Sequence, residues 1–176
     1  PHFTKGGKYE KYYAVYEMFD TIFYSPKTVT KYAPHARAAL DLKRVMTYVV
    51  IATIPAILFG LYNTGFQANT ALANLGQETA GGWRGWVLDT FGIGYDPSSI
   101  LACFFHGFLY FVPIYLTTLI VGGIVEVTFA VIRGHEVNEG FFVTSMLYSL
   151  IVPATIPLWQ AAVGIIFGVV IGTAVF

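Results

Sequence analysis

Ser99–Ile132 reads SILACFFHGFLYFVPIYLTTLIVGGIVEVTFAVI and contains a single acid, Glu126. As one straight helix this run would extend ~50 Å, which exceeds the ~30 Å hydrocarbon core of a bilayer. It contains no polar turn, so we expect one long helix over 99–132 that tilts, kinks at Pro113 or protrudes from the membrane. The run therefore predicts a membrane-spanning helix and an all-α membrane protein.

Composition supports the same class. Of the 176 residues, 56% are hydrophobic and 11% are charged, whereas soluble domains carry about 25% charged residues. The only cysteine, Cys103, lies in an apolar run, so the chain has no disulfide framework. The chain lacks an initiator Met and stops within an apolar segment, so we expect it to be a piece of a longer polytopic protein.

The remaining hydropathy pattern predicts a polar extension and three further apolar segments. Residues 1–44 form the extension, in which aromatic residues recur on one helical face; this helix either lies in the membrane interface or packs on a neighbouring subunit. The rest, 45–176, is expected to be transmembrane, with helices over 45–63, 99–132, 141–152 and 158–176 and a loop over 64–98. The first 44 residues hold eight of the ten Lys and Arg residues, which predicts a cytoplasmic N-terminus.

Two prolines, Pro153 and Pro157, separate the last two apolar segments. Broken helices in membrane proteins expose backbone dipoles to a ligand or ion near the midplane. A buried proline kink without a ligand explains the same pattern, and the sequence does not choose between them.

Glu126 is the most unusual residue of the long run. A carboxylate at the bilayer centre costs roughly 2.5–3.5 kcal/mol on insertion scales and usually faces a cavity or a partner. It shares a helical face with Gly122 and Gly123, which leave a notch beside it. Three interpretations stay open: helix packing, an ion or proton relay, and a ligand pocket.

The polar segment RGHEVNEGFF, residues 133–142, follows on the predicted cytoplasmic side. Its imidazole, amide and carboxylate groups stand next to two phenylalanines, a combination that suits a quinone ring and its carbonyl groups. A capping loop that opens the next helix explains the same residues. The sequence contains no catalytic set and no metal-ligand spacing, so any redox chemistry would depend on cofactors.

Several stretches together resemble the NqrB family, whose members are membrane subunits of sodium-translocating NADH:quinone oxidoreductases. These stretches are GGKYEKYYAVYE, DLKRVMTYVV, VGGIVEV and GHEVNEGFFVTSMLYSLIVPATIPLWQAAVGIIFGVV. The related RnfD proteins of Rnf complexes share the membrane architecture but lack the GGKYEK extension. The resemblance implies a polytopic protein of the bacterial inner membrane, the first inverted-repeat half of a urea-transporter-like fold, assembled with the other subunits of the complex. A non-redox channel or transporter and a structural scaffold are the rival classes.

The resemblance also implies ubiquinone as substrate, sodium as the transported ion, and FMN and riboflavin as cofactors. The family attaches FMN to a threonine of an S-G-A-T motif, which this chain lacks; FMN attachment is therefore expected outside these residues, as are most riboflavin contacts. Glu126 is in addition a candidate for sodium uptake. The implied quinone-binding residues are Gly122, Gly123, Glu126, His135, Val137, Asn138, Glu139, Gly140, Phe141 and Phe142.

Overall fold

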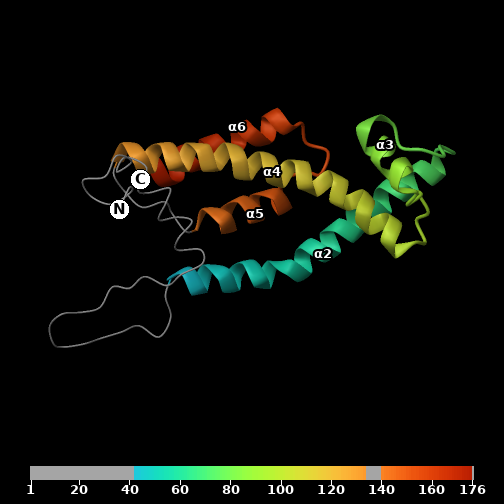
Figure 1. Cartoon of the computed structure of the whole chain (residues 1–176), viewed down its shortest axis with the longest axis horizontal. Coiled ribbons are helices and arrows are strands. Elements are labelled where there is room, and N and C mark those ends of the chain that lie inside the picture. Colours follow the sequence, from blue (N-terminus) through green and yellow to red (C-terminus); the bar gives the residue numbers. More distant parts are fainter. Residues whose placement is uncertain (1–41, 134–139, 176) are drawn as a thin grey trace.

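The computed structural model of the chain describes residues 42–133 and 140–175, which fold into helices and short connections without a strand (Figure 1). Two segments, Val45–Asn74 and Ile100–Arg133, are long and apolar enough to cross a membrane. The predicted class, an all-α polytopic membrane protein, is confirmed. In chain order the elements are α2 (Leu42–Asn74), α3 (Gly82–Phe91), α4 (Ile100–Arg133), α5 (Phe141–Ile151), α6 (Leu158–Val169) and a terminal π-helical segment, η2 (Val170–Val175).

Helix α2 is longer than the hydropathy pattern predicts, because it continues past Asn63 to Asn74. The additional turns pack on α4 through Gly65 and Asn69, which lie one turn apart and are buried. A Cβ atom on Gly65 would overlap the carbonyl oxygen of Cys103, so the two backbones are in direct contact. Tertiary packing, which a hydropathy pattern does not report, therefore sustains the helix beyond its apolar part.

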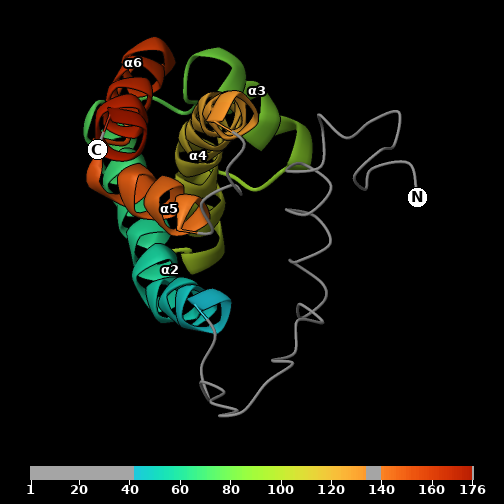
Figure 2. The ribbon, with the colours of Figure 1, turned by 90° about the vertical axis from the view of Figure 1, so that its left-hand side faces the viewer.

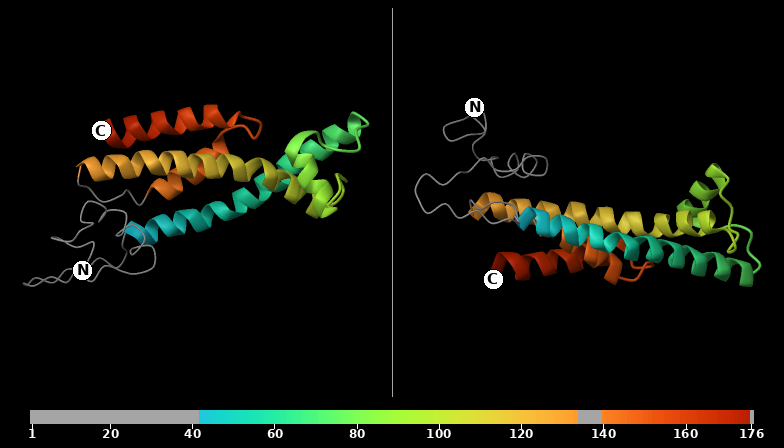
Figure 3. Two further views of the ribbon diagram at one scale, coloured as in Figure 1. Left: turned by 45° about the horizontal axis from the view of Figure 1, so that its top comes forward. Right: turned by 90° about the horizontal axis from the view of Figure 1, so that it is seen from below.

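The expected loop over 64–98 is wrong for a second reason, because it also contains α3. This helix is anchored by Leu88, which is completely buried, and by Gly85, which lies against the backbone of Ala80. Gly92 closes it in the left-handed conformation, with φ 64°, a geometry that glycine adopts at low cost. As a result, α3 stands at the end of the molecule where α2 and α4 meet (Figure 1 and Figure 3).

Helix α4 is continuous, with Pro113 inside it. From Ile114 onward, every fourth residue of this helix is buried, so the buried residues form one narrow line. Buried residues follow the same four-residue spacing on α5 and α6. Rows of residues four apart form the ridges by which helices commonly interdigitate. The buried line of α4 consists of Ile114, Thr118, Gly122, Glu126 and Ala130.

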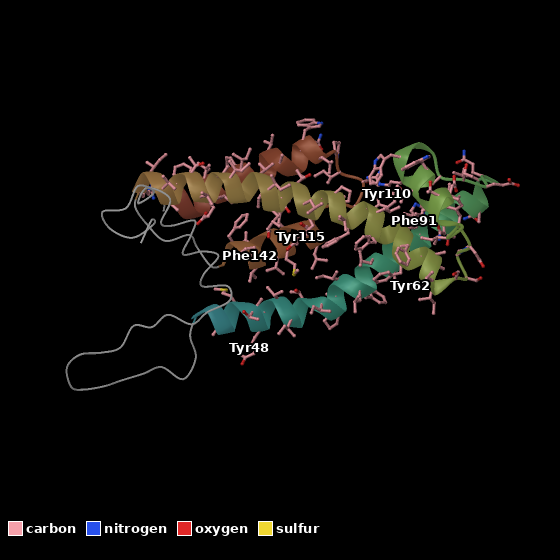
Figure 4. All side chains as sticks on the ribbon, viewed as in Figure 1. Tyr48, Tyr62, Phe91, Tyr110, Tyr115 and Phe142 are labelled. Atoms are coloured by element: carbon pink, nitrogen blue, oxygen red, sulfur yellow. The ribbon has the colours of Figure 1, made fainter. Side chains whose placement is uncertain are left out.

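Many large apolar side chains outside these lines point away from the bundle. Phe59 of α2 is 71% exposed and Ile151 of α5 is 80% exposed, and Tyr48 projects outward from α2 (Figure 4). Apolar surface left in water forgoes roughly 25 cal/mol per Å² of stabilisation. Lipid removes that disadvantage, so these faces agree with a bilayer as solvent.

Helices α5 and α6 run in opposite directions, so the proline-broken segment reverses and does not continue in line (Figure 1 and Figure 3). The hydroxyl of Tyr148 on α5 donates to the carbonyl of Ala161 on α6 at 3.1 Å. Pro157 occupies the N-cap of α6, where its missing N–H breaks no helical hydrogen bond. Helices α5 and α6 both pack on α4. The three helices lie together in the end-on view (Figure 2).

Candidate functional site

The face of α4 that carries Gly122 is covered by α5 and α6. A Cβ atom on Gly122 would lie 2.7 Å from two ring atoms of Phe141 and 3.0 Å from Cγ1 of Ile165. Phe141 is 7% exposed and belongs to the core cluster that also contains Ile165 and Val169. The notch beside Gly122 is therefore filled by the chain's own phenylalanine ring, as the helix-packing interpretation predicts.

The neighbouring glycine has more room. A Cβ atom on Gly123 would be in ordinary contact with Phe141, 3.6 Å from Cε1, and Gly123 itself is half-buried. Glu126 follows on the buried line of α4 and is 8% exposed. The carboxylate and the half-buried glycine thus lie within one turn of each other, near the cytoplasmic end that the sequence predicts for α4.

The two consecutive phenylalanines have different environments. Phe141 points into the core, whereas Phe142 is 37% exposed at the beginning of α5 (Figure 4). Their ring centroids are 6.4 Å apart, with 56° between the ring planes. Successive residues of a helix point about 100° apart, so only one of the pair remains available to a ligand at the surface of the bundle.

A row of buried hydroxyl groups joins α4 to α5. Thr118 Oγ1 and Ser149 Oγ are 3.0 Å apart, and Ser149 Oγ also donates to the carbonyl of Ser145 at 2.7 Å. Because every hydroxyl in the row has a partner, the row adds specific hydrogen bonds to an otherwise apolar interface. Sequence reasoning missed it, although the signal was present as small polar residues at the same spacing as Gly122 and Glu126.

Comparison with known proteins identifies the family. Residues 29–176 match the NQR2, RnfD, RnfE family. The chain belongs to this family. It is 60% identical over its whole length to the NqrB subunit of the Na(+)-translocating NADH-quinone reductase of Chromohalobacter salexigens, of which it covers 43%. It is 55% identical over 99% of its length to the corresponding subunit of Stutzerimonas stutzeri, of which it covers 44%.

The chain therefore spans less than half the length of these curated relatives of the NQR2, RnfD, RnfE family. The family match begins at residue 29, but the Chromohalobacter relative aligns over the whole chain. The N-terminal extension, whose GGKYEK stretch favours NqrB over RnfD, thus lies within the alignment with that relative.

The structure describes only part of the site expected for this family member. Gly122 and Gly123 lie against Phe141 at the beginning of α5, where Phe142 follows, and Gly140 directly precedes that helix. Glu126 lies one turn further along the buried line of α4. Four other predicted residues lie outside the described residues: His135, Val137, Asn138 and Glu139.

A second polar cluster, which sequence reasoning also missed, lies where α2 crosses α4. His106 Nδ1 is 2.6 Å from Asn69 Oδ1, and Asn69 Nδ2 is 3.6 Å from Cys103 Sγ. All three side chains are buried. The cluster therefore links α2 to α4 by buried hydrogen bonds.

Proposed function

We propose that the chain is part of NqrB, a membrane subunit of a sodium-translocating NADH:quinone oxidoreductase, in a bacterial inner membrane with its N-terminus in the cytoplasm. The observation that carries this proposal is 60% identity over the full chain to the Chromohalobacter relative. The long apolar helices support a membrane location. In this proposal the chain acts only together with its other half and the partner subunits.

We further propose that the α4–α5 junction contributes to the ubiquinone site. The support is the arrangement of a half-buried Gly123, the Glu126 carboxylate and the partly exposed Phe142 ring. Glu126 precedes Arg133 by seven residues, which is ~10 Å along a helix, so a ligand there is within reach of the headgroup region. Gly122 and Phe141 form the packed wall behind the proposed site. The polar residues His135, Asn138 and Glu139 lie outside the described residues and stay predicted members of it.

Glu126 is also the proposed residue for sodium uptake. A carboxylate that is 8% exposed inside an apolar helix is the type of group that marks ion pathways in membrane proteins. Sodium binds oxygen ligands, and Glu126 provides two carboxylate oxygens at the same junction. Quinone reduction and sodium uptake would therefore be close enough to influence each other.

The flavins of the proposed enzyme would carry electrons from NADH towards the quinone, but the residues of this chain do not fit FMN attachment. The chain contains no S-G-A-T threonine that would accept the phosphate link. We therefore assign to these residues the binding of quinone and sodium only, and we propose that FMN and riboflavin are held mainly by the rest of the protein.

A photoreactive ubiquinone analogue tests the proposed quinone site in the purified complete complex. Irradiation is expected to attach the analogue to the peptide spanning residues 122–142, and excess ubiquinone should suppress the labelling. Labelling confined to another polypeptide or to α2 would refute the site. Absence of any competed labelling, together with sodium conduction that does not depend on NADH, would favour the rival channel or transporter.

A further inference from the structure

Helix α3 presents an aromatic outer face. Trp83, Trp86 and Phe91 are 50%, 70% and 74% exposed, while Leu88 on the inner face is completely buried. Figure 4 shows Phe91 at the end of α3, away from the α4–α5 junction. Three large aromatic side chains on one short helix are not typical of a surface in contact with water, and such patches mark interaction sites.

The apolar surface continues from α3 onto a membrane-spanning helix. Ile100 and Leu101, in the first turn of α4, are 72% and 62% exposed, and α4 is apolar enough to cross a bilayer. Charged groups flank α3 on its two connections, at Glu78 and Asp96. Hydrogen bonds from Ser98 hold the pKa of Asp96 below its usual range, so this carboxylate stays ionised.

Aromatic side chains next to exposed charges are the composition of a membrane–water interface. Trp has an apolar ring and a polar N–H, and it is enriched at the headgroup level on both sides of membranes. The described parts of the chain place α3 between two candidate spanning helices, at the end where they meet (Figure 3). The aromatic face is therefore continuous with lipid-facing surface.

Arg84 of α3 is partly buried and is held against α4 and Trp83. Its guanidinium carbon is 4.3 Å from the ring centroid of Tyr110 and 4.9 Å from that of Trp83, and its Nε donates to the carbonyl of Leu109 at 3.3 Å. Within the described residues Arg84 makes no ion pair, and its terminal nitrogens have no hydrogen-bond partner. A planar guanidinium presented in this way matches two oxygens of a phosphate.

We propose that α3 is an interfacial anchor, with Trp83, Trp86 and Phe91 among lipid headgroups and Arg84 bound to the phosphodiester of a phospholipid. A lipid is favoured over a protein partner because the aromatic face continues the lipid-facing surface of α4. The phosphodiester of such a lipid would also complement the charge of Arg84. Tryptophan and arginine also dominate protein–protein hot spots, so a protein contact is one outcome of the test.

Photocrosslinking distinguishes these partners in the complete complex in its native membrane. Benzoylphenylalanine replaces Trp83 or Trp86, with Gln77, an exposed residue of the α2–α3 connection, as the control position. We expect phospholipid adducts at 83 and 86 and none at 77. Crosslinks from 83 and 86 to another polypeptide, or an absence of adducts at both positions, would overturn the proposal.

The arginine contact is tested in the unsubstituted complex by dipolar dephasing of ¹³C-labelled arginine by ³¹P, with a variant used only for assignment. The complex is reconstituted in vesicles of phosphatidylethanolamine and phosphatidylglycerol, and Arg84→Lys assigns the signal. We expect dephasing of the Arg84 guanidinium, lost in phosphate-free galactolipid vesicles even with inorganic phosphate added. Dephasing that inorganic phosphate restores would show a free-anion site, and no dephasing in phospholipid would show no phosphate contact; either result contradicts the proposal.

Discussion

At the scale of single residues, neighbouring positions of identical type have different roles. Gly122 lies where α5 and α6 meet α4, whereas Gly123, one residue later, has only ordinary contact with Phe141. Phe141 is buried and Phe142 is partly exposed. A helix turns about 100° per residue. In each pair, therefore, the first residue is packed in the core and the second is partly accessible.

Substitution of Gly122 by Ala should destabilise the α4–α5–α6 packing. The added methyl would lie 2.7 Å from the Phe141 ring and 3.0 Å from Ile165, and overpacking of this kind costs about 1–3 kcal/mol. A lower Tm of the purified full-length complex measures the effect. Gly123→Ala is the matched control, and equal Tm values for the two variants would show that the notch is not tightly filled.

Substitution of Glu126 by Gln should weaken the sodium dependence of quinone reduction, because the amide keeps the size but loses the charge. We expect the half-saturating sodium concentration to rise roughly tenfold, equivalent to ~1.4 kcal/mol. Sodium titration of quinone reductase activity is the measurement, with Glu78→Gln as an exposed-acid control. An unchanged titration in an assembled complex would leave Glu126 with a packing role only.

Substitution of Phe142 by Ala should raise the apparent quinone KM while electron entry from NADH is preserved. By analogy with the stacking of bases on aromatic side chains, about 1–3 kcal/mol is lost, or roughly 5- to 150-fold. Steady-state kinetics with ubiquinone and with an artificial acceptor separate the two steps. Phe59→Ala, which removes a 71% exposed ring from α2, is the control; an equal KM for both variants would exclude a stacking role.

At the scale of elements, glycine determines how closely the long helices approach. Gly65 of α2 faces the carbonyl of Cys103, and Gly107 of α4 faces the carbonyl of Leu61. Because neither backbone can move aside as a side chain can, this crossing is the most constrained contact between α2 and α4. The same contact stabilises the last turns of α2, which extends to Asn74 and so beyond its apolar part.

Substitution of Gly65 by Ala should therefore disrupt the crossing of α2 and α4. We expect the free energy of unfolding to fall by about 3 kcal/mol or more, at the upper end of the overpacking range. Gly60→Ala is the matched control, because nothing lies within 4 Å of its added methyl and Ala favours the helix by up to about 1 kcal/mol. Thermal unfolding of both variants in detergent gives the comparison. A Gly65→Ala variant as stable as Gly60→Ala would mean that the helices separate at no cost.

At the scale of the whole molecule, the two proposed sites lie at opposite ends of the described helices. The aromatic helix α3 lies at one end, and the α4–α5 junction lies at the other (Figure 1). The excess of basic residues before α2 predicts that the α4–α5 junction lies on the cytoplasmic side. The proposed quinone site and the proposed interfacial anchor would then face opposite leaflets.

Cysteine labelling in intact cells should confirm this orientation. In a Cys103→Ala background, Gln77→Cys is expected to react with a membrane-impermeant maleimide from outside, and Arg133→Cys only after permeabilisation. Both positions are exposed, so reactivity reports access and not burial. Labelling of both positions from the same side would disprove the topology.

The sequence by itself determined the solvent and the main elements. Its low charge and its long apolar run predicted a membrane protein with one continuous helix, and Pro153 and Pro157 marked the break between α5 and α6. These features depend on composition and local backbone chemistry, which a sequence states directly. Only the tertiary structure decided that Phe141 fills the notch at Gly122, that α2 extends to Asn74, and that His106 pairs with Asn69. Each of these depends on how closely two helices approach, and that distance is set by side chains far apart in the chain.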